Sequence, residues 1–175
     1  MLTPSEKGAI AEAAITAAAV KLGIVVLRPI VEGRRYDLLF DIDHDLMRVQ
    51  CKSGALKGDV IAARISTSRY TPRGYVVTKY TQDEIDAFAI YCPALDCCYL
   101  LPIGEFAGLT YVHLRVRPTR NNQAIGVRMA ADYEFGAIAQ LGERPAGSRE
   151  AVGSSPTSST AHAGDVGGRP LADRT

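Results

Sequence analysis

The sequence lacks the segments that would assign it to several large classes of protein. No apolar run approaches the roughly 20 residues that are needed to span a membrane. The N-terminus has no basic segment followed by an apolar one, as a secretory signal would have. The chain also has no Gly-rich phosphate loop of the P-loop or dinucleotide type. We therefore expect a cytoplasmic protein that has no membrane partner.

Histidine and cysteine are scarce, which argues against two common kinds of site. The sequence contains three histidines and four cysteines, which are His44, His113, His162, Cys51, Cys92, Cys97 and Cys98. The histidines are scattered and the cysteines do not have zinc-finger spacing, so neither a zinc site nor a histidine-based triad is supported. We expect the cysteines to be small buried apolar groups in a reducing cytosol, with metal binding as a minor alternative.

Length and composition are those of a soluble domain with a sizeable core. The 175 residues are 47% apolar and 22% charged, and the net charge of +1 says nothing about partners. An Ala-rich segment with Thr3, Pro4 and Glu6 at its start and Gly23 at its end predicts a helix over residues 4–22.

Runs of β-branched and aromatic residues predict the strands. They lie at residues 24–30, 38–40, 48–51, 60–65, 75–77, 85–91, 99–102 and 112–116, with a turn and a short helix at 102–106. A helix followed by several strands and short helices predicts an α/β or α+β fold, with a mixed central β-sheet flanked by helices.

The composition changes after Glu134. Residues 136–175 are dominated by Gly, Ala, Ser, Pro and Thr, which bury too little apolar surface to offset the entropy of ordering. Residues 136–144 and 152–156 also resemble the conceptual translation of a transfer-RNA gene, because the T-arm sequence GGTTCGAGTCC gives Gly-Ser-Ser-Pro in one frame. An ordinary flexible tail is the alternative. We expect residues 1–135 to form the functional domain and residues 136–175 a disordered tail without a site.

The segments around Asp37 and Gln50 predict a hairpin that gathers polar groups. If the chain turns at residues 43–44, Asp37 lies opposite Gln50, and Gln50 and Lys52 point to the same side of their strand. A carboxylate, an amide oxygen and an ammonium then meet in one patch. The backbone carbonyl of Cys51 lies between them at the strand edge.

Such a patch has the groups that phosphodiester hydrolysis needs. Asp37, Gln50 and the Cys51 carbonyl would hold Mg²⁺, with Mn²⁺ as an alternative ion, and Glu12 on the predicted helix would join the outer shell. Lys52 would orient the attacking water and offset the phosphate charge. The ordinary alternatives are a turn residue for Asp37, a solvated strand face for Gln50 and Lys52, and a solvated helix face for Glu12.

Basic residues are concentrated in two stretches that contain almost no acid. Residues 46–81 have Asp59 as their only acid, and residues 107–131 have none. The candidate DNA contacts are Lys57, Arg64, Arg69, Arg73, Lys79, Arg115, Arg117, Arg120, Asn121, Asn122 and Arg128, with Tyr70, Tyr75 and Tyr80 interleaved in the first stretch. A solvated basic face is the alternative, and we favour DNA contact because arginine grips phosphates and reads guanine.

Several separated motifs then point to one family. They lie at residues 7–12, 35–38, 49–53, 91–93, 99–102 and 119–123, followed by Arg128 and residues 132–133. In this order they resemble the PD-(D/E)XK nuclease superfamily, and within it the group I intron-encoded homing endonucleases. The resemblance runs from about residue 6 to residue 134.

The resemblance implies a restriction-endonuclease-like core and a catalytic set of Asp37, Gln50 and Lys52, assisted by Glu12. It implies Mg²⁺ as cofactor, double-stranded DNA as substrate, and a homo-oligomer, either a dimer or a tetramer. The superfamily usually has Asp or Glu in place of Gln50, whereas the intron-encoded branch has Gln there, which removes one negative charge and should weaken Mg²⁺ binding. The transfer-RNA-like tail fits an intron reading frame that runs into the downstream exon.

Two other functions fit the same sequence. The first is a Holliday-junction resolvase or repair nuclease of the same fold, which would differ in the form of its DNA substrate. The second is a catalytically inactive DNA-binding protein.

Overall fold

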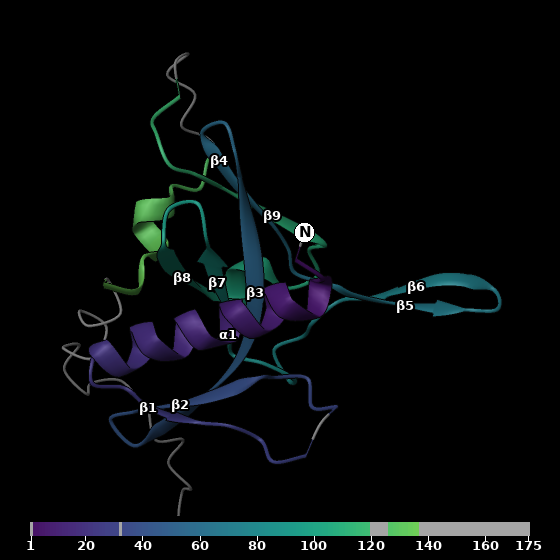
Figure 1. Cartoon of the computed structure of the whole chain (residues 1–175), viewed down its shortest axis with the longest axis horizontal. Coiled ribbons are helices and arrows are strands. Elements are labelled where there is room, and N and C mark those ends of the chain that lie inside the picture. Colours follow the sequence, from purple (N-terminus) through teal and green to yellow (C-terminus); the bar gives the residue numbers. More distant parts are fainter. Residues whose placement is uncertain (1, 32, 120–125, 137–175) are drawn as a thin grey trace, which may run out of the picture. The chain divides into compact units, whose positions relative to one another are not determined.

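The computed structural model describes residues 2–31, 33–119 and 126–136, which all lie within one compact unit, Met1–Arg144 (Figure 1). The elements are α1 (Pro4–Lys21), β1 (Val25–Leu27), β2 (Leu38–Ile42), β3 (Asp45–Lys57), β4 (Val60–Arg64), β5 (Thr67–Thr71), β6 (Gly74–Thr78), β7 (Ala87–Cys92), β8 (Cys97–Pro102), α2 (Ile103–Phe106), β9 (Tyr111–Arg115) and η1 (Ala130–Tyr133). The predicted α/β fold with a mixed central sheet is therefore confirmed. None of the helices in the described ranges is long and apolar enough to cross a membrane.

Helix α1 begins and ends where the sequence predicts. The Thr3 hydroxyl accepts a hydrogen bond from the backbone N–H of Glu6 at 3.2 Å, and the Glu6 carboxylate accepts one from the backbone N–H of Thr3 at 2.7 Å. Gly23 follows the last turn with a φ of 79°, a conformation that favours glycine. One stripe of the helix, centred on Ile15, is buried against the sheet.

Strand β3 is the hub of the sheet. Its first part pairs with β2, with Val49 opposite Leu38, and its last part pairs with β4 from Gly54 to Lys57. On the opposite edge β7 runs parallel to β3 from Val49 to Ser53. Because β2 begins at Leu38 and the pairing with β4 begins at Gly54, residues 50–53 have no strand partner on the β2 edge within the described part of the chain. We call this opening, between β2 and β4, the fork.

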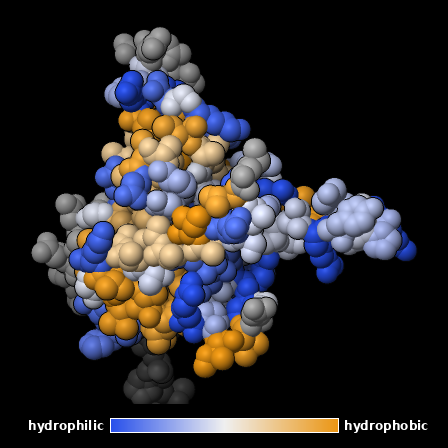
Figure 2. Space-filling view, in the orientation of Figure 1, coloured by the Kyte–Doolittle hydropathy of each residue, from blue (hydrophilic) through white to orange (hydrophobic). Residues whose placement is uncertain are grey.

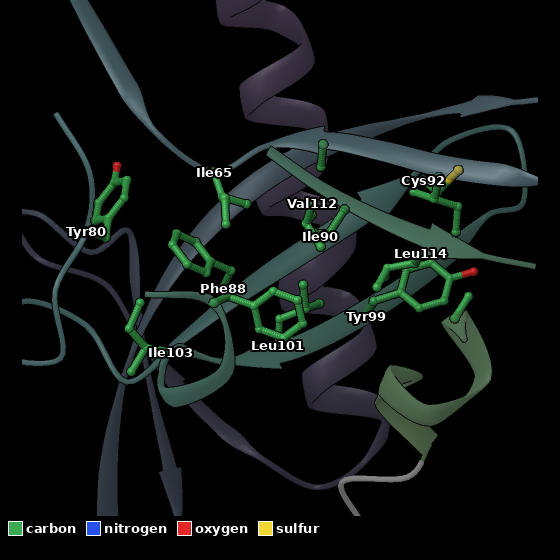
Figure 3. Packing of buried hydrophobic residues seen from close by; sticks show 14 of the residues in the cluster. Ile65, Tyr80, Phe88, Ile90, Cys92, Tyr99, Leu101, Ile103, Val112 and Leu114 are labelled. Carbon is green, nitrogen blue, oxygen red and sulfur yellow. The ribbon is translucent and has the colours of Figure 1, made fainter. Parts of the chain in front are cut away.

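The two faces of the sheet are covered by different elements. Helix α1 lies across β3 and packs over Phe40 and Val49 (Figure 1). On the other face, Figure 3 shows Phe88 and Leu101 packed with Leu114 of β9. A large side chain that is fully buried contributes roughly 1.5–3 kcal/mol, so both layers hold β3 firmly in place.

Strands β5 and β6 form a separate hairpin that projects from the sheet (Figure 1). Tyr70 and Tyr75 face each other across it with ring centroids 5.3 Å apart, and they are 73% and 76% exposed. Figure 2 shows a mainly hydrophilic surface on this hairpin. The exposed side chains of this hairpin are therefore accessible to a partner.

Several elements differ from the sequence prediction, among them β3, which spans Asp45–Lys57 where only residues 48–51 are predicted, and η1, which is not predicted. The strand predicted over residues 24–30 is shortened to Val25–Leu27, because Pro29 cannot donate a ladder hydrogen bond. Strand β5 is not predicted at all, because its sequence lacks alternating apolar residues. The four cysteines are free, and Cys51 and Cys92 are buried as expected, whereas Cys97 and Cys98 are only half-buried.

The alignment of β3 with β7 is reinforced by an ion pair between Arg48 and Asp86. The Asp86 carboxylate accepts hydrogen bonds from the backbone N–H of Arg48 at 2.7 Å, from its Nε at 3.0 Å and from its Nη2 at 2.8 Å. The side-chain hydrogen bonds from Arg48 hold the pKa of Asp86 below its usual value. This pair therefore helps to fix the strand that forms the fork.

We expect Asp86→Asn to lower the free energy of unfolding by about 1–2 kcal/mol at pH 7, after allowing for solvent screening of this partly exposed pair. The pKa of Asp86 is lowered in the folded protein. The stabilisation that the Asp86 carboxylate gives to the folded protein is therefore complete above the pKa of Asp86 in the unfolded chain, which is about 3.9. This stabilisation is lost as the pH falls through the lower pKa of Asp86 in the folded protein. In urea unfolding, the difference between wild type and variant should shrink below about pH 4.

Asp45→Asn is the control for this prediction, because Asp45 is an exposed carboxylate that forms no ion pair with the described residues. This substitution should leave the unfolding midpoint unchanged. An equal loss in both variants, or a loss from Asp86→Asn that does not depend on pH, would contradict the role given to the Arg48–Asp86 pair.

Candidate active site at the fork of the central sheet

The β2–β3 hairpin has the register that the sequence predicts. Its turn is at residues 43–44, whose φ angles of 51° and 73° are the positive values that this tight turn needs. Leu38 pairs with Val49, and the backbone N–H of Asp37 donates to the Val49 carbonyl at 2.9 Å. Asp37 therefore lies at the fork, beside the open edge of residues 50–53.

Two donors from β3 hold the Asp37 carboxylate. Its Oδ2 accepts hydrogen bonds from the backbone N–H of Cys51 at 2.8 Å and from the side-chain nitrogen of Gln50. Gln50 is only 6% exposed, and the same nitrogen lies 3.4 Å from the carbonyl oxygen of Cys51. Burial raises the pKa of Asp37, and the hydrogen bond from Cys51 partly offsets this.

The orientation of the Gln50 amide differs from the expected one. A metal ligand would present the amide oxygen, whereas in the structure the nitrogen faces Asp37. That nitrogen is a positively polarised donor, and it lies between a carboxylate and the Cys51 carbonyl oxygen, where a cation would also be favoured. Turning the amide over would bring its oxygen to the same place. The oxygens of Asp37 and Cys51 therefore face one point, which the Gln50 nitrogen occupies, and a cation would bind there only if this amide moved aside.

Lys52 lies on the same side of β3 as Gln50. Their pairing partners in β7 both belong to the core cluster on that face. The Lys52 Nζ lies 3.3 Å from the hydroxyl of Tyr80. Burial lowers the pKa of Lys52, and the nearby Asp37 carboxylate opposes this. The structure thus brings Asp37, Gln50 and Lys52 to one place, and their catalytic roles stay predictions.

Glu12 on α1 lines the same cleft as Asp37. This cleft has a volume of about 330 Å³ and is also lined by Arg28 and Tyr36. The Glu12 carboxylate forms an ion pair with Arg28 at 2.7 Å. Burial and the proximity of Asp37 raise the pKa of Glu12, and Arg28 opposes them. A bound cation would relieve the unfavourable interaction between the two carboxylates.

The donor set fits a hard divalent cation such as Mg²⁺. Carboxylate and carbonyl oxygens are the ligands that this ion prefers, and Asp37, Glu12 and the Cys51 carbonyl supply them. Burial raises the pKa of the Cys51 thiol, and a neutral thiol is a poor ligand for a hard cation, so we assign the ligand role to the Cys51 carbonyl. No three residues among His, Cys, Asp and Glu gather into a metal-binding group in the described ranges. A cation here would therefore need Gln50 and the backbone as well as the two acids.

Comparison with known proteins identifies the family to which the chain belongs. A family model for PD-(D/E)XK endonucleases matches residues 2–136. The chain belongs to the PD-(D/E)XK endonuclease family. The solved structure of a bacterial homing endonuclease, I-Ssp6803I, is similar to it with a TM-score of 0.67 and 27% sequence identity, over 81% of this chain and 96% of that one. No curated protein matches the chain. The resemblance that the sequence motifs indicate is thus confirmed.

The basic residues of this endonuclease are spread over the hairpin and the outer strands. The exposed ones are Lys57, Arg64, Arg69, Arg73, Lys79 and Arg117, and Arg115 and Arg128 are half-buried. The predicted contacts Arg120, Asn121 and Asn122 lie outside the described residues. Arg117 lies 3.8 Å from Asp59, and the Arg128 guanidinium lies 4.8 Å from the centre of the Phe106 ring. Their contact with DNA stays a prediction.

One groove on the endonuclease combines basic and aromatic side chains. Lys57 and Arg64 line it together with Tyr111 and His113, over a volume of about 460 Å³. The Arg64 guanidinium lies 5.9 Å from the centre of the Tyr111 ring. Arg64 also disfavours the charged form of Lys52, so this groove lies within electrostatic range of the fork.

One of the tyrosines interleaved with the basic residues is not at the surface. Tyr80 is 3% exposed, because its ring packs edge-to-face on Phe88 at 5.3 Å and lies 4.0 Å from the Arg35 guanidinium. Tyr80 is therefore part of the core and not of an exposed basic and aromatic surface. Tyr70 and Tyr75 are exposed on the hairpin.

The sequence does not predict the roles of three residues that surround the site. Arg28 pairs with Glu12, and Arg35 and Tyr80 surround Lys52. No spacing in the sequence singles out any of them, because each acts on residues that are distant along the chain. The one signal in the sequence is that Arg35 precedes Asp37 in one of the family motifs.

Proposed function

We propose that this endonuclease is a Mg²⁺-dependent homing endonuclease that cuts both strands of double-stranded DNA at a specific site and is encoded within a group I intron. The observation that carries the proposal is the convergence of the Asp37 carboxylate, the Gln50 amide and the Cys51 carbonyl at the fork, with Lys52 beside them. The similarity to I-Ssp6803I supports the same function.

The residues at the fork would divide the chemistry between them. Asp37, Gln50, Glu12 and the Cys51 carbonyl would hold Mg²⁺, or Mn²⁺ in its place. When bound, such an ion lowers the pKa of water and offsets the negative charge of the phosphate. Lys52 would orient the attacking water and donate to the phosphate oxygens that become more negative. Its half-buried position strengthens this interaction because water screens it less.

Basic residues outside the fork would hold the duplex. Arg69 and Arg73 are exposed on the β5–β6 hairpin, and a two-stranded ribbon of this kind fits the major groove of B-DNA. Lys57 and Arg64 in the basic groove would contact phosphates, which position the protein without reading sequence. We further propose that two or four copies of the chain act together on one site.

The final segment suggests where the target lies. Residues 136–175 resemble a translated transfer-RNA gene, as expected if an intron reading frame continues into the downstream exon. Nearly all of this segment lies outside the described residues, so the division into a domain at 1–135 and a disordered tail stays a prediction. The same transfer-RNA gene without its intron is the candidate target.

We expect the full chain to cut duplex DNA that carries the uninterrupted transfer-RNA gene in Mg²⁺ or Mn²⁺, and to lose all cutting in EDTA. The protein should stay folded in EDTA, because the Gln50 nitrogen and the Cys51 N–H satisfy Asp37, and its melting temperature should fall only by the stabilisation that the bound ion contributed. Conversion of a supercoiled plasmid to its linear form measures cutting, and thermal unfolding measures the fold. A plasmid with the gene interrupted by its intron is the control.

Other outcomes of this assay would point to the alternative functions. Cutting in EDTA would contradict the metal site. Cutting of four-way junctions without sequence preference would indicate a resolvase. Binding of the duplex without cutting in either ion would indicate an inactive DNA-binding protein.

A further inference from the structure

A buried tyrosine holds the ammonium of Lys52. The Lys52 Nζ donates to the Tyr80 hydroxyl at 3.3 Å and lies 5.3 Å from the centre of its ring. Burial raises the pKa of Tyr80 to about 12, so the hydroxyl stays neutral and can accept this hydrogen bond. Tyr80 therefore offers Lys52 both a hydrogen-bond acceptor and an aromatic face.

Tyr80 is itself fixed from two sides. Its ring packs on Phe88 with the planes at 89°, at the edge of the core cluster on that face of the sheet (Figure 3). The guanidinium of Arg35 lies 4.0 Å from the ring centre. The side chain that holds Lys52 therefore has little freedom to move.

Arg35 connects this tyrosine to the base of the projecting hairpin. Its Nη2 donates to the Lys79 carbonyl at 2.9 Å, just after β6, and its Nη1 donates to the Thr67 hydroxyl at 3.4 Å, at the start of β5. Its Nε also donates to Glu84 at 3.0 Å. One guanidinium thus joins both ends of the hairpin to the ring that holds Lys52.

We propose that Tyr80 is a positioning residue, which fixes the Lys52 ammonium at the fork and is clamped in turn by Arg35. The proposal rests on the endonuclease function proposed above and deepens it. The lysine side chain is a flexible four-carbon chain, and a small displacement of a reacting group can greatly slow an enzyme. The Tyr80 hydroxyl restricts this chain before any substrate arrives. The competing explanation is that Tyr80 only fills space in the core.

Tyr80→Phe separates these explanations, because phenylalanine keeps the ring and removes only the hydroxyl. We expect the single-turnover rate of DNA cutting to fall by about 10- to 100-fold, with the Kd for DNA and the melting temperature unchanged. Tyr133→Phe is the matched control. It removes a hydroxyl that donates to Glu105 at 2.7 Å, among residues that do not form the fork, and it should cut at the wild-type rate.

A second measurement tests the positioning without DNA or metal. In protein labelled with ¹³C at lysine, relaxation of the Lys52 side chain should show greater mobility in Tyr80→Phe than in wild type, while the exposed Lys57 should not change. If Tyr80→Phe does not fold, Arg35→Lys provides the test. It keeps the tyrosine and should still raise the mobility of Lys52, because lysine cannot reproduce the planar contact.

The outcomes are distinct. An active wild type together with a Tyr80→Phe variant that cuts equally fast would overturn the proposal, and so would unchanged Lys52 mobility in the variant that folds. If wild type does not cut at all, the proposed function fails, and the relaxation measurement still decides whether Tyr80 restrains Lys52.

Discussion

Lys52→Ala should abolish DNA cutting and leave DNA binding largely intact. Its ammonium lies within electrostatic range of the Asp37 carboxylate, and the proposed function has it act on the water and the phosphate during the reaction. Removing a preorganised donor of this kind lowers the rate by about 10²- to 10³-fold. Binding depends on the sum of many phosphate contacts, to which this half-buried lysine adds little. Plasmid linearisation in Mg²⁺ measures cutting, and a gel shift in EDTA measures binding.

Lys21→Ala is the control for this experiment, because Lys21 is an exposed lysine at the end of α1 and should not affect cutting. Lys52→Arg adds a sharper comparison. It keeps the positive charge but replaces a compact ammonium by a planar guanidinium, so it should restore little activity. Wild-type cutting by Lys52→Ala would exclude the assigned role, and loss of binding to the same degree as cutting would make Lys52 a DNA contact instead.

The parts of the fold that were predicted correctly depend on local chemistry. The capping box at Thr3 and Glu6 fixes the start of α1 from adjacent residues. The turn at residues 43–44 fixes the pairing of β2 with β3, because a two-residue turn leaves only one register. Register and side-chain alternation together place Asp37, Gln50 and Lys52 side by side. The centre of the candidate site is therefore predictable from local sequence alone.

The parts that were missed depend on contacts between distant segments. From its position among basic residues Tyr80 is expected to be an exposed aromatic residue. It is buried because Phe88 and Arg35, which lie in other segments of the chain, pack against its ring. Arg28 likewise meets Glu12 only in the folded structure. The orientation of the Gln50 amide depends on the Asp37 carboxylate, which takes the donor end when no cation is present.

The hairpin formed by β5 and β6 shows a different reason why a strand cannot be predicted from the sequence. Strand β5 has mostly polar residues, so no apolar alternation distinguishes it from a loop. Among the strands that the structure describes it pairs with β6 alone, and none of its residues belongs to either core cluster. A hairpin of this kind needs support from elsewhere, because isolated hairpins are marginally stable in water. Part of that support comes from Arg35, which bonds to Thr67 and to the Lys79 carbonyl at its base.

Asp37→Asn should remove cutting as completely as Lys52→Ala, but for a different reason. Asp37 carries the ionic part of the proposed metal site, and a neutral amide is a much poorer ligand for Mg²⁺. The fold should survive, because the asparagine oxygen can take the place of Oδ2 and accept from both the Cys51 N–H and the Gln50 side-chain nitrogen. Replacing a buried carboxylate also removes the unfavourable burial that raises the pKa of Asp37. The free energy of unfolding at pH 7 should therefore change by less than about 1 kcal/mol.

Glu12→Gln is the variant to compare with Asp37→Asn. Glu12 is already paired with Arg28, so it contributes less net negative charge to the cleft than Asp37 does. We expect a graded result, in which Asp37→Asn abolishes Mn²⁺ binding measured by electron paramagnetic resonance and Glu12→Gln only weakens it. Cutting should fall in the same order, which separates a metal ligand from an outer-shell residue. If Asp37→Asn binds Mn²⁺ as tightly as wild type, the ion is held elsewhere, and the fork is not the metal site.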